Sequence, residues 1–169
     1  MQEQHQIQLQ EAELTDVPSL LHLYSQLGQD DGRVLSVTQA ERIFLLMTAY
    51  PDYRIYVAKY RDLTVGCFAL LVMDNIAHLG ACSAIVEDVV VEVSWRGRGV
   101  GKLMMAFARQ LAEEKGCYKM VLSSNRHREA AHRFYEKLGF VRHGYSFSIN
   151  CLPVKEISHD RRSSYLSHQ

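Results

Sequence analysis

Apolar residues recur along this chain at two spacings, and each spacing predicts one kind of element. Alternation of apolar and polar residues, or a run of β-branched residues, predicts strands, whereas recurrence every three or four residues predicts amphipathic helices. Strands are expected at residues 7–13, 53–60, 64–73, 84–93 and 118–123, with a last strand or strand pair within residues 140–149. Helices are expected at residues 15–28, 38–50, 99–115 and 128–138.

Capping residues mark the ends of the predicted helices. Thr15 or Asp16 caps the first helix, and Pro18 fits its first turn. Residues 38–41, which read Thr-Gln-Ala-Glu, match a capping box for the second helix. The other three helices each end at a glycine: Gly28, Gly116 and Gly139.

The predicted elements follow the order β-α-α-β-β-β-α-β-α-β. Consecutive strands come first, and a strand–helix–strand unit follows. This order predicts an α/β sandwich with about four helices, whose mixed, mostly antiparallel sheet has six to seven strands, and not a doubly wound parallel sheet. The 169 residues suffice for one domain with a full core. We expect that domain at residues 1–150 and a polar C-terminal tail at residues 151–169.

The charge balance and the cysteines indicate which partners and which cellular location to expect. The 19 basic and 19 acidic side chains cancel, so neither nucleic acid nor an anionic membrane is expected as a partner. No apolar run approaches the roughly 20 residues that span a bilayer. The four cysteines form no Cys-x-x-Cys pair, and the polar start at residues 1–6 does not resemble a secretory leader. We therefore expect reduced thiols and a cytoplasmic location.

Three glycines at alternate positions, Gly97, Gly99 and Gly101, separate a valine-rich strand from a helix. Such a turn aims backbone N–H groups and a helix N-terminus at one point, which suits a phosphate; close strand-to-helix packing is the alternative. A Walker A loop is excluded, because Arg96 stands where that motif has its first glycine. A dinucleotide fingerprint is excluded, because Lys102 stands where its third glycine is needed.

The spacing Arg96-x-x-Gly99-x-Gly101 resembles the GNAT family of N-acetyltransferases, which bind acetyl-coenzyme A through this loop. The resemblance extends over about residues 7–149, with a second signature at residues 132–140 and a central strand at 85–91. Residues 116–119 and 134–137 resemble glucosamine-6-phosphate N-acetyltransferases, whereas residues 131–135 resemble aminoalkylphosphonate acetyltransferases. The two resemblances imply different amines.

The resemblance implies a set of cofactor-binding residues. The edge of the central strand would pair with the amides of the acetyl-CoA arm, and a bulge there would free an N–H of Val89–Val90 for the thioester carbonyl. The main chain of the glycine turn would hold the pyrophosphate, while Arg96, Arg98 and Lys102 either reach the phosphates or are simply solvated. Asn125 either caps the following helix or bonds the cofactor. The implied set is Val89, Val90, Val91, Arg96, Gly97, Arg98, Gly99, Val100, Gly101, Lys102 and Asn125.

Two residues are expected to carry the chemistry. Tyr135 lies at the rim of a helical core stripe, and in this family the equivalent tyrosine contacts the thiol end of the cofactor. A phenol there can protonate the departing thiolate; packing alone is the alternative. Glu87 is expected to take a proton from the incoming ammonium, directly or through water. Asp88, its neighbour, is expected to point to the opposite face and to bind substrate or serve a structural role. An outward-facing acidic pair remains the alternative.

These inferences predict an acyltransferase that moves an acetyl group from acetyl-CoA to the primary amine of a small molecule, with no metal ion. A protein or peptide N-acetyltransferase and a non-catalytic acetyl-CoA sensor are the alternatives. The acceptor is expected beneath the first two helices, between residues 28–35 and 74–81, with Asp30 and Asp31 as polar contacts or as solvated loop residues. The sequence leaves the oligomeric state open, although family members often pair through their last strands, here near residues 140–149, so that a homodimer is one of the possible states. The acceptor's identity stays open.

Overall fold

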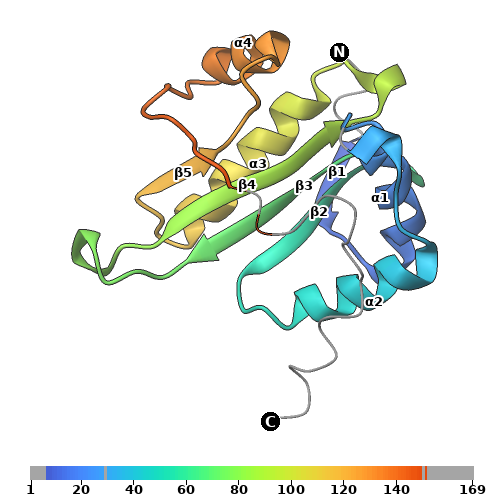
Figure 1. The fold of residues 1–169 in the computed structure, drawn as a ribbon, viewed down its shortest axis with the longest axis horizontal. Coiled ribbons are helices and arrows are strands. Elements are labelled where there is room, and N and C mark those ends of the chain that lie inside the picture. Colours follow the sequence, from blue (N-terminus) through green and yellow to red (C-terminus); the bar gives the residue numbers. More distant parts are fainter. Residues whose placement is uncertain (1–6, 29, 150, 152–169) are drawn as a thin grey trace.

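The structure is a computed structural model that describes residues 7–28, 30–149 and 151. Its single sheet has five strands in the spatial order β1-β2-β3-β4-β5 (Figure 1). All neighbouring strands are antiparallel except β4 and β5, which are parallel. The strands are β1 (Ile7–Glu11), β2 (Tyr53–Tyr60), β3 (Leu63–Met73), β4 (Ser83–Val91) and β5 (Lys119–Leu122). The mixed, mostly antiparallel sheet agrees with the prediction.

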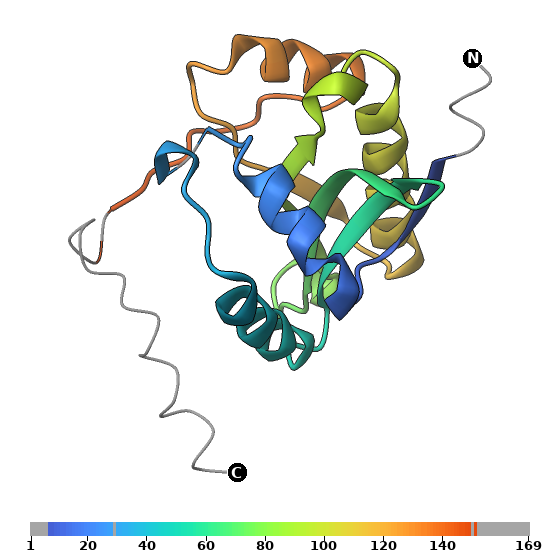
Figure 2. The same cartoon turned by 90° about the vertical axis from the view of Figure 1, so that its right-hand side faces the viewer.

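Four α-helices cover the two faces of this sheet within the described residues. They are α1 (Val17–Tyr24), α2 (Val37–Thr48), α3 (Val100–Glu114) and α4 (Glu129–Lys137). Helices α1 and α2 lie on one face and α3 on the other (Figure 2). None of the helices in the described part of the chain is long and apolar enough to cross a bilayer.

Each face of the sheet has its own hydrophobic core. On the α3 face, Phe68 and Val86 pack against Met104 and Ala108, and all four are fully buried or nearly so. On the α1 face, Leu20 and Leu23 of α1 pack against strand residues such as Val57. Helix α4 lies over the margin of the α3-face core through Phe134, Tyr135 and Leu138. Helix α2 has no fully buried residue, so it closes the other face more loosely.

The predicted strand at residues 140–149 is wrong, and so is the count of six to seven strands. Large apolar residues do alternate there, but Val141, Tyr145, Phe147 and Ile149 are 79%, 92%, 91% and 86% exposed, and the segment is not a strand. Alternation specifies which side chains a strand would bury, but it does not supply a partner edge. The C-terminal tail, apart from Cys151, lies outside the described residues.

The predicted capping box of α2 lies two residues too late. Ser36 is the N-cap: its Oγ accepts from the N–H of Gln39 at 3.3 Å, and Gln39 Oε1 accepts from the N–H of Ser36 at 3.1 Å. Both Ser36–Gln39 and Thr38–Glu41 match the box pattern, so the local sequence does not choose between them.

Candidate functional site

The parallel strands β4 and β5 part halfway along β4. They pair from Ser83 with Lys119 to Val86 with Leu122, where β5 ends while β4 continues to Val91. Within the described chain, no strand therefore covers the β5 side of β4 beyond Val86. An uncovered strand edge presents main-chain N–H and C=O groups to an extended ligand.

A β-bulge lies on this uncovered part of β4. Val90 pairs with Cys67 and Glu87 pairs with Ala69, so two residues of β4, Asp88 and Val89, lie opposite the single residue between them on β3. Asp88 has a φ of 50°, in the left-handed region that non-glycine residues rarely adopt. This backbone breaks the alternation of side chains, and both Glu87 and Asp88 line the same cleft. The expectation that the two carboxylates face opposite sides depends on a regular strand, which the bulge interrupts.

The cleft has a volume of about 160 Å³ and lies between the parted strands, beneath α4. It brings together four of the predicted site residues, Glu87, Asp88, Val89 and Tyr135, although Tyr135 lies more than 40 positions from the other three in the sequence. Its remaining walls come from residues that sequence reasoning did not select: Leu27, Val86, Leu122, Ser123, Ser124 and Arg128.

Packing of two phenylalanines holds Tyr135 at the cleft. Its ring lies 5.1 Å from the ring of Phe134 and 5.6 Å from that of Phe140, both edge-on. Burial raises the pKa of the Tyr135 phenol, and the Arg128 guanidinium in the same cleft opposes this rise. The phenol is therefore protonated at neutral pH and can donate a proton.

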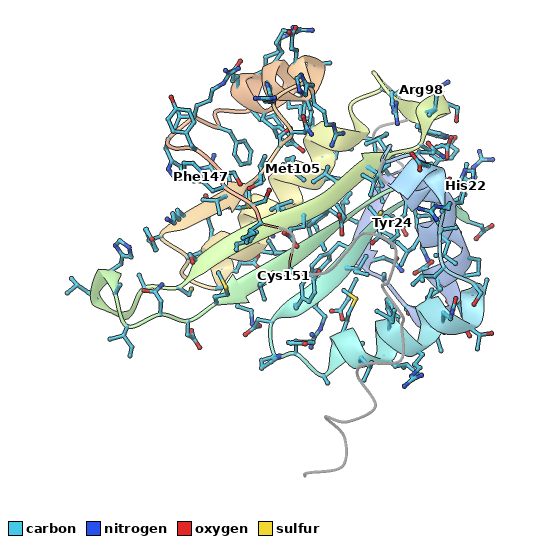
Figure 3. All side chains as sticks on the ribbon, viewed as in Figure 1. His22, Tyr24, Arg98, Met105, Phe147 and Cys151 are labelled. Atoms are coloured by element: carbon cyan, nitrogen blue, oxygen red, sulfur yellow. The ribbon has the colours of Figure 1, made fainter. Side chains whose placement is uncertain are left out.

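A cluster of acidic and phenolic groups lies on the α1 side of the bulge. Desolvation raises the pKa of the Asp88 carboxyl. Burial, with the carboxylates of Glu87 and Asp88 nearby, raises the pKa of Tyr53 on β2. Burial also raises the pKa of Tyr24, whose phenol bonds the thiol of Cys67 and is close enough to Asp88 to respond to its charge (Figure 3 labels Tyr24). Such a surface favours a cationic amine over an anion.

The glycine turn joins β4 to α3 next to this cleft. Gly97 and Gly99 have φ values of 75° and 86°, which explains the need for glycine at both. The first hydrogen bond of the helix runs from the N–H of Leu103 to the carbonyl of Gly99 at 3.1 Å. Helix geometry therefore leaves the N–H groups of Val100, Gly101 and Lys102 to bind an anion.

Gly101 has a different reason to be glycine. A Cβ there would come within 3.1 Å of Cζ of Phe134, the neighbour of Tyr135. The missing side chain thus lets α3 and α4 approach each other closely. Tight packing therefore explains Gly101, whereas the left-handed backbone explains Gly97 and Gly99.

The basic residues of the turn already have protein partners. Arg96 donates from Nε to the carbonyl of Val91 at 3.1 Å. The guanidinium of Arg98 lies over the ring of Trp95, 5.2 Å from its centroid, at the end of β4 where the turn begins (Figure 3). These contacts fix the two side chains beside the cradle.

Three further predicted residues lie outside the cleft. Asn125 Oδ1 accepts from the N–H of His127 at 3.0 Å, which closes the turn between β5 and α4. It therefore caps this turn and not the helix, whose N-cap is Arg128. Asp30 and Asp31 lie in a 3-10 turn between α1 and α2, where Asp31 has a φ of 54°.

Ser124 is the clearest residue that sequence reasoning missed. Its Oγ is buried in the cleft wall and has no hydrogen-bond partner within the described chain. A buried hydroxyl without a hydrogen-bond partner raises the free energy of the folded protein, and a hydrogen bond to a ligand would remove this penalty. The position of Ser124 in the sequence could have indicated this role. Ligands commonly bind beyond the carboxyl ends of parallel strands, and Ser123 and Ser124 directly follow β5.

These features fit an extended donor with a phosphate group. The uncovered edge of β4 leads into the turn before α3, and the unsatisfied hydroxyl of Ser124 lies in the cleft that β4 lines. Tyr135 and Glu87 line the same cleft.

Comparisons with protein families and with curated proteins both point to N-acetyltransferases. A family model described as "Acetyltransferase (GNAT) domain" matches residues 51–142. A probable glucosamine 6-phosphate N-acetyltransferase of Drosophila melanogaster is 36% identical over 72% of this chain and 54% of its own length. An aminoalkylphosphonate N-acetyltransferase of Salmonella typhimurium is 28% identical over 58% of this chain and 63% of its own. The chain spans about half the length of the glucosamine 6-phosphate relatives it matches.

A solved structure covers more of the chain than these relatives do. A putative acetyltransferase from Agrobacterium tumefaciens superposes with a TM-score of 0.80 and 35% identity, covering 85% of this chain and 99% of that one. The resemblance inferred from the motifs is thereby confirmed, including the two groups of enzymes that it pointed to.

Proposed function

This chain belongs to the GNAT acetyltransferase family, and we propose that it transfers the acetyl group of acetyl-CoA to the primary amine of a small molecule. The transfer is a direct aminolysis of the thioester within a complex of both substrates. One observation carries this proposal: the bulge of β4 places Glu87 and Tyr135 in one cleft, beside an uncovered strand edge.

The donor binds along β4 and at the turn that follows it. The main chain of Val89, Val90 and Val91 pairs with the amides of the donor arm. Ser124 Oγ, which lacks a partner in the cleft wall, accepts or donates a further bond to that arm. The N–H groups from Arg98 to Lys102 hold the pyrophosphate at the start of α3.

Each catalytic group either transfers a proton or stabilises a charge that develops during the reaction. The donor supplies an activated thioester, and holding it against the amine makes the reaction effectively unimolecular. Glu87 takes the proton that the ammonium must lose before it attacks. A main-chain N–H freed by the bulge at Val89–Val90 stabilises the developing oxyanion. Tyr135 then donates its proton to the departing thiolate sulfur, and no step requires a metal ion.

The acceptor lies on the α1 side of the bulge. Asp88 and the phenols of Tyr24 and Tyr53 form an acidic, partly desolvated surface that binds an ammonium. Asp30 and Asp31, on the turn between α1 and α2, contribute polar contacts to the acceptor. Both groups of named relatives act on an amine that also carries a phosphate or phosphonate, and Arg128 supplies a cation in the cleft for such a group.

The test is a thiol-release assay with acetyl-CoA and a panel of acceptors. The panel contains glucosamine 6-phosphate, 2-aminoethylphosphonate, their phosphorus-free counterparts, polyamines, amino acids and lysine peptides. Release with one or more small amines, and not with peptides, supports the proposal. Peptide acetylation would favour the protein acetyltransferase. Tight binding of acetyl-CoA by calorimetry with no thiol release across the panel would favour the sensor.

We propose further that this chain acts in the cytoplasm as a homodimer, with a single acetyltransferase domain at residues 1–150 and a tail at 151–169. Its four cysteines are all free thiols. Tyr145, Phe147 and Ile149 are large apolar residues that stand exposed, and in the proposed dimer the matching segment of a second copy covers them (Figure 3 labels Phe147). Light scattering should give a dimer for the natural chain and a monomer for Phe147→Asp.

A further inference from the structure

Two thiols lie in contact at the end of the β4–β5 pair that is remote from the cleft. The Sγ atoms of Cys82 and Cys117 are 3.3 Å apart, although 35 positions separate them in the sequence. Cys82 directly precedes β4, and Cys117 lies in the turn from α3 to β5. Neither residue has a role in acetyl transfer.

Main-chain hydrogen bonds hold both cysteines in place. The N–H of Tyr118 donates to the carbonyl of Cys82 at 2.9 Å, and the N–H of Cys117 donates to the carbonyl of Ala112 at 2.9 Å. The thiol of Cys82 also donates to the carbonyl of Lys115 at 3.2 Å. Cys82 is only 8% exposed, whereas Cys117 is partly exposed, so a small oxidant can reach the pair from the Cys117 side.

We propose that Cys82 and Cys117 form a dithiol modification site that hydrogen peroxide converts into an intramolecular disulfide. In the first step, the sulfur of Cys117 attacks one oxygen of the peroxide and the O–O bond breaks. The products are a sulfenic acid at Cys117 and one molecule of water. In the second step, the sulfur of Cys82 attacks that sulfenic sulfur, the S–O bond breaks, and a second water leaves. The two thiols lose two hydrogens in total, and a dithiol reductant restores them.

The surroundings of the pair predict how its reactivity depends on pH. Burial and the contact with Cys82 raise the pKa of the Cys117 thiol. Asp52 raises it further, while the Lys115 ammonium, bound to Asp52 at 2.7 Å, lowers it. The thiolate is the reacting form, so oxidation is slow at neutral pH and accelerates as the pH rises.

The disulfide would enclose the segment that carries the proposed main-chain contacts to the donor. The loop between Cys82 and Cys117 contains β4 with its bulge, the glycine turn and α3. Closing such a loop restricts the unfolded chain more than the folded one, whose sulfurs already touch. The oxidised protein should therefore unfold at a higher temperature than the reduced protein.

The experiment treats the full chain with peroxide, blocks remaining thiols with N-ethylmaleimide, and maps peptides without reduction. We expect a peptide pair joined through Cys82 and Cys117, with a rise in the unfolding temperature that dithiothreitol reverses. Cys151→Ser, at an exposed cysteine, is the matched control and should keep both effects, whereas Cys117→Ser should lose both. Sulfinic acid at Cys117 with Cys82 still open to alkylation, or disulfides through Cys151 alone, would overturn the proposal.

A second measurement needs no variant. Phenylarsine oxide bridges two thiols only when they lie close together, so the reduced natural chain should bind one arsenical and lose alkylation at both Cys82 and Cys117. Alkylation of both residues at an undiminished rate would show that the thiols do not meet in solution and would refute the site.

Discussion

The imidazole of His22 and the carboxylate of Glu92 meet at 2.8 Å, between Nε2 and Oε2, although they lie 70 positions apart. Gln26 donates to the same carboxylate oxygen at 2.7 Å, and its own Oε1 accepts from the N–H of Val93 at 3.1 Å. These bonds join α1, on the proposed acceptor side, to the end of β4 just before the glycine turn (Figure 3 labels His22). They link helix α1 directly to the segment that we propose binds the donor.

Glu92→Gln should destabilise the protein in a pH-dependent way. The bond from Gln26, and then His22, lowers the pKa of Glu92 below its ordinary value near 4.5. A lowered folded-state pKa stabilises the fold above the ordinary value, and this contribution disappears as the pH falls through the lower one. Thermal unfolding near neutral pH should show a loss of about 2–4 °C for the variant.

The same comparison repeated in acid provides the check. The difference in unfolding temperature between the natural chain and Glu92→Gln should shrink as the pH drops below the ordinary value of the carboxyl. A difference that stays constant into acid would show that the charge of Glu92 contributes nothing.

Tyr135→Phe should lower kcat by on the order of 100-fold while changing the affinity for acetyl-CoA far less. The phenylalanine keeps the packing against Phe134 and Phe140 and removes only the proton donor. Because burial raises the pKa of Tyr135, the natural enzyme should lose activity only in strongly alkaline solution. Tyr118→Phe, outside the cleft, is the control and should leave kcat unchanged.

Glu87→Gln should move the pH–rate profile to higher pH, because the amine must then lose its proton before it binds. Asp88→Asn should instead raise KM for the amine and leave the profile in place. Asparagine tolerates the left-handed backbone of position 88, so the bulge itself should persist. Steady-state rates across pH for both variants separate the two roles, and identical profiles for all three proteins would assign the base to another group.

Gly101→Ala should destabilise the protein by about 1 kcal/mol, because the overlap of the new Cβ with Phe134 outweighs the preference of a helix for alanine. A displaced Phe134 would also shift Tyr135, so kcat should fall together with stability. Gly144→Ala is the matched control: a Cβ there meets nothing within 4 Å. Denaturant unfolding of both variants gives the comparison, and equal stabilities would mean that α3 and α4 do not depend on this contact.

The sequence predicted the strands and helices that surround the site, but not the strand pairing that gives the site its geometry. Residues 84–93 read as a strand because valines run together, yet nothing in that run marks Asp88 as the bulged residue. The bulge exists because β3 offers one residue opposite two of β4, which depends on pairing with a strand 20 positions away. Residues 140–149 show a different failure of the local pattern. Their apolar residues do alternate as in a strand, but no strand of the described chain pairs with them.

What the sequence determined by itself is local. The turns at Gly97 and Gly99, the helix periodicity from Val100 onward and the family motif all depend on sterics and hydrogen bonds within a few residues. Tertiary structure alone decided that Glu87, Ser124 and Tyr135 share a cleft and that Cys82 touches Cys117. These residues come from separate elements, and their proximity depends on where the sheet register and the packing of α3 and α4 place each element.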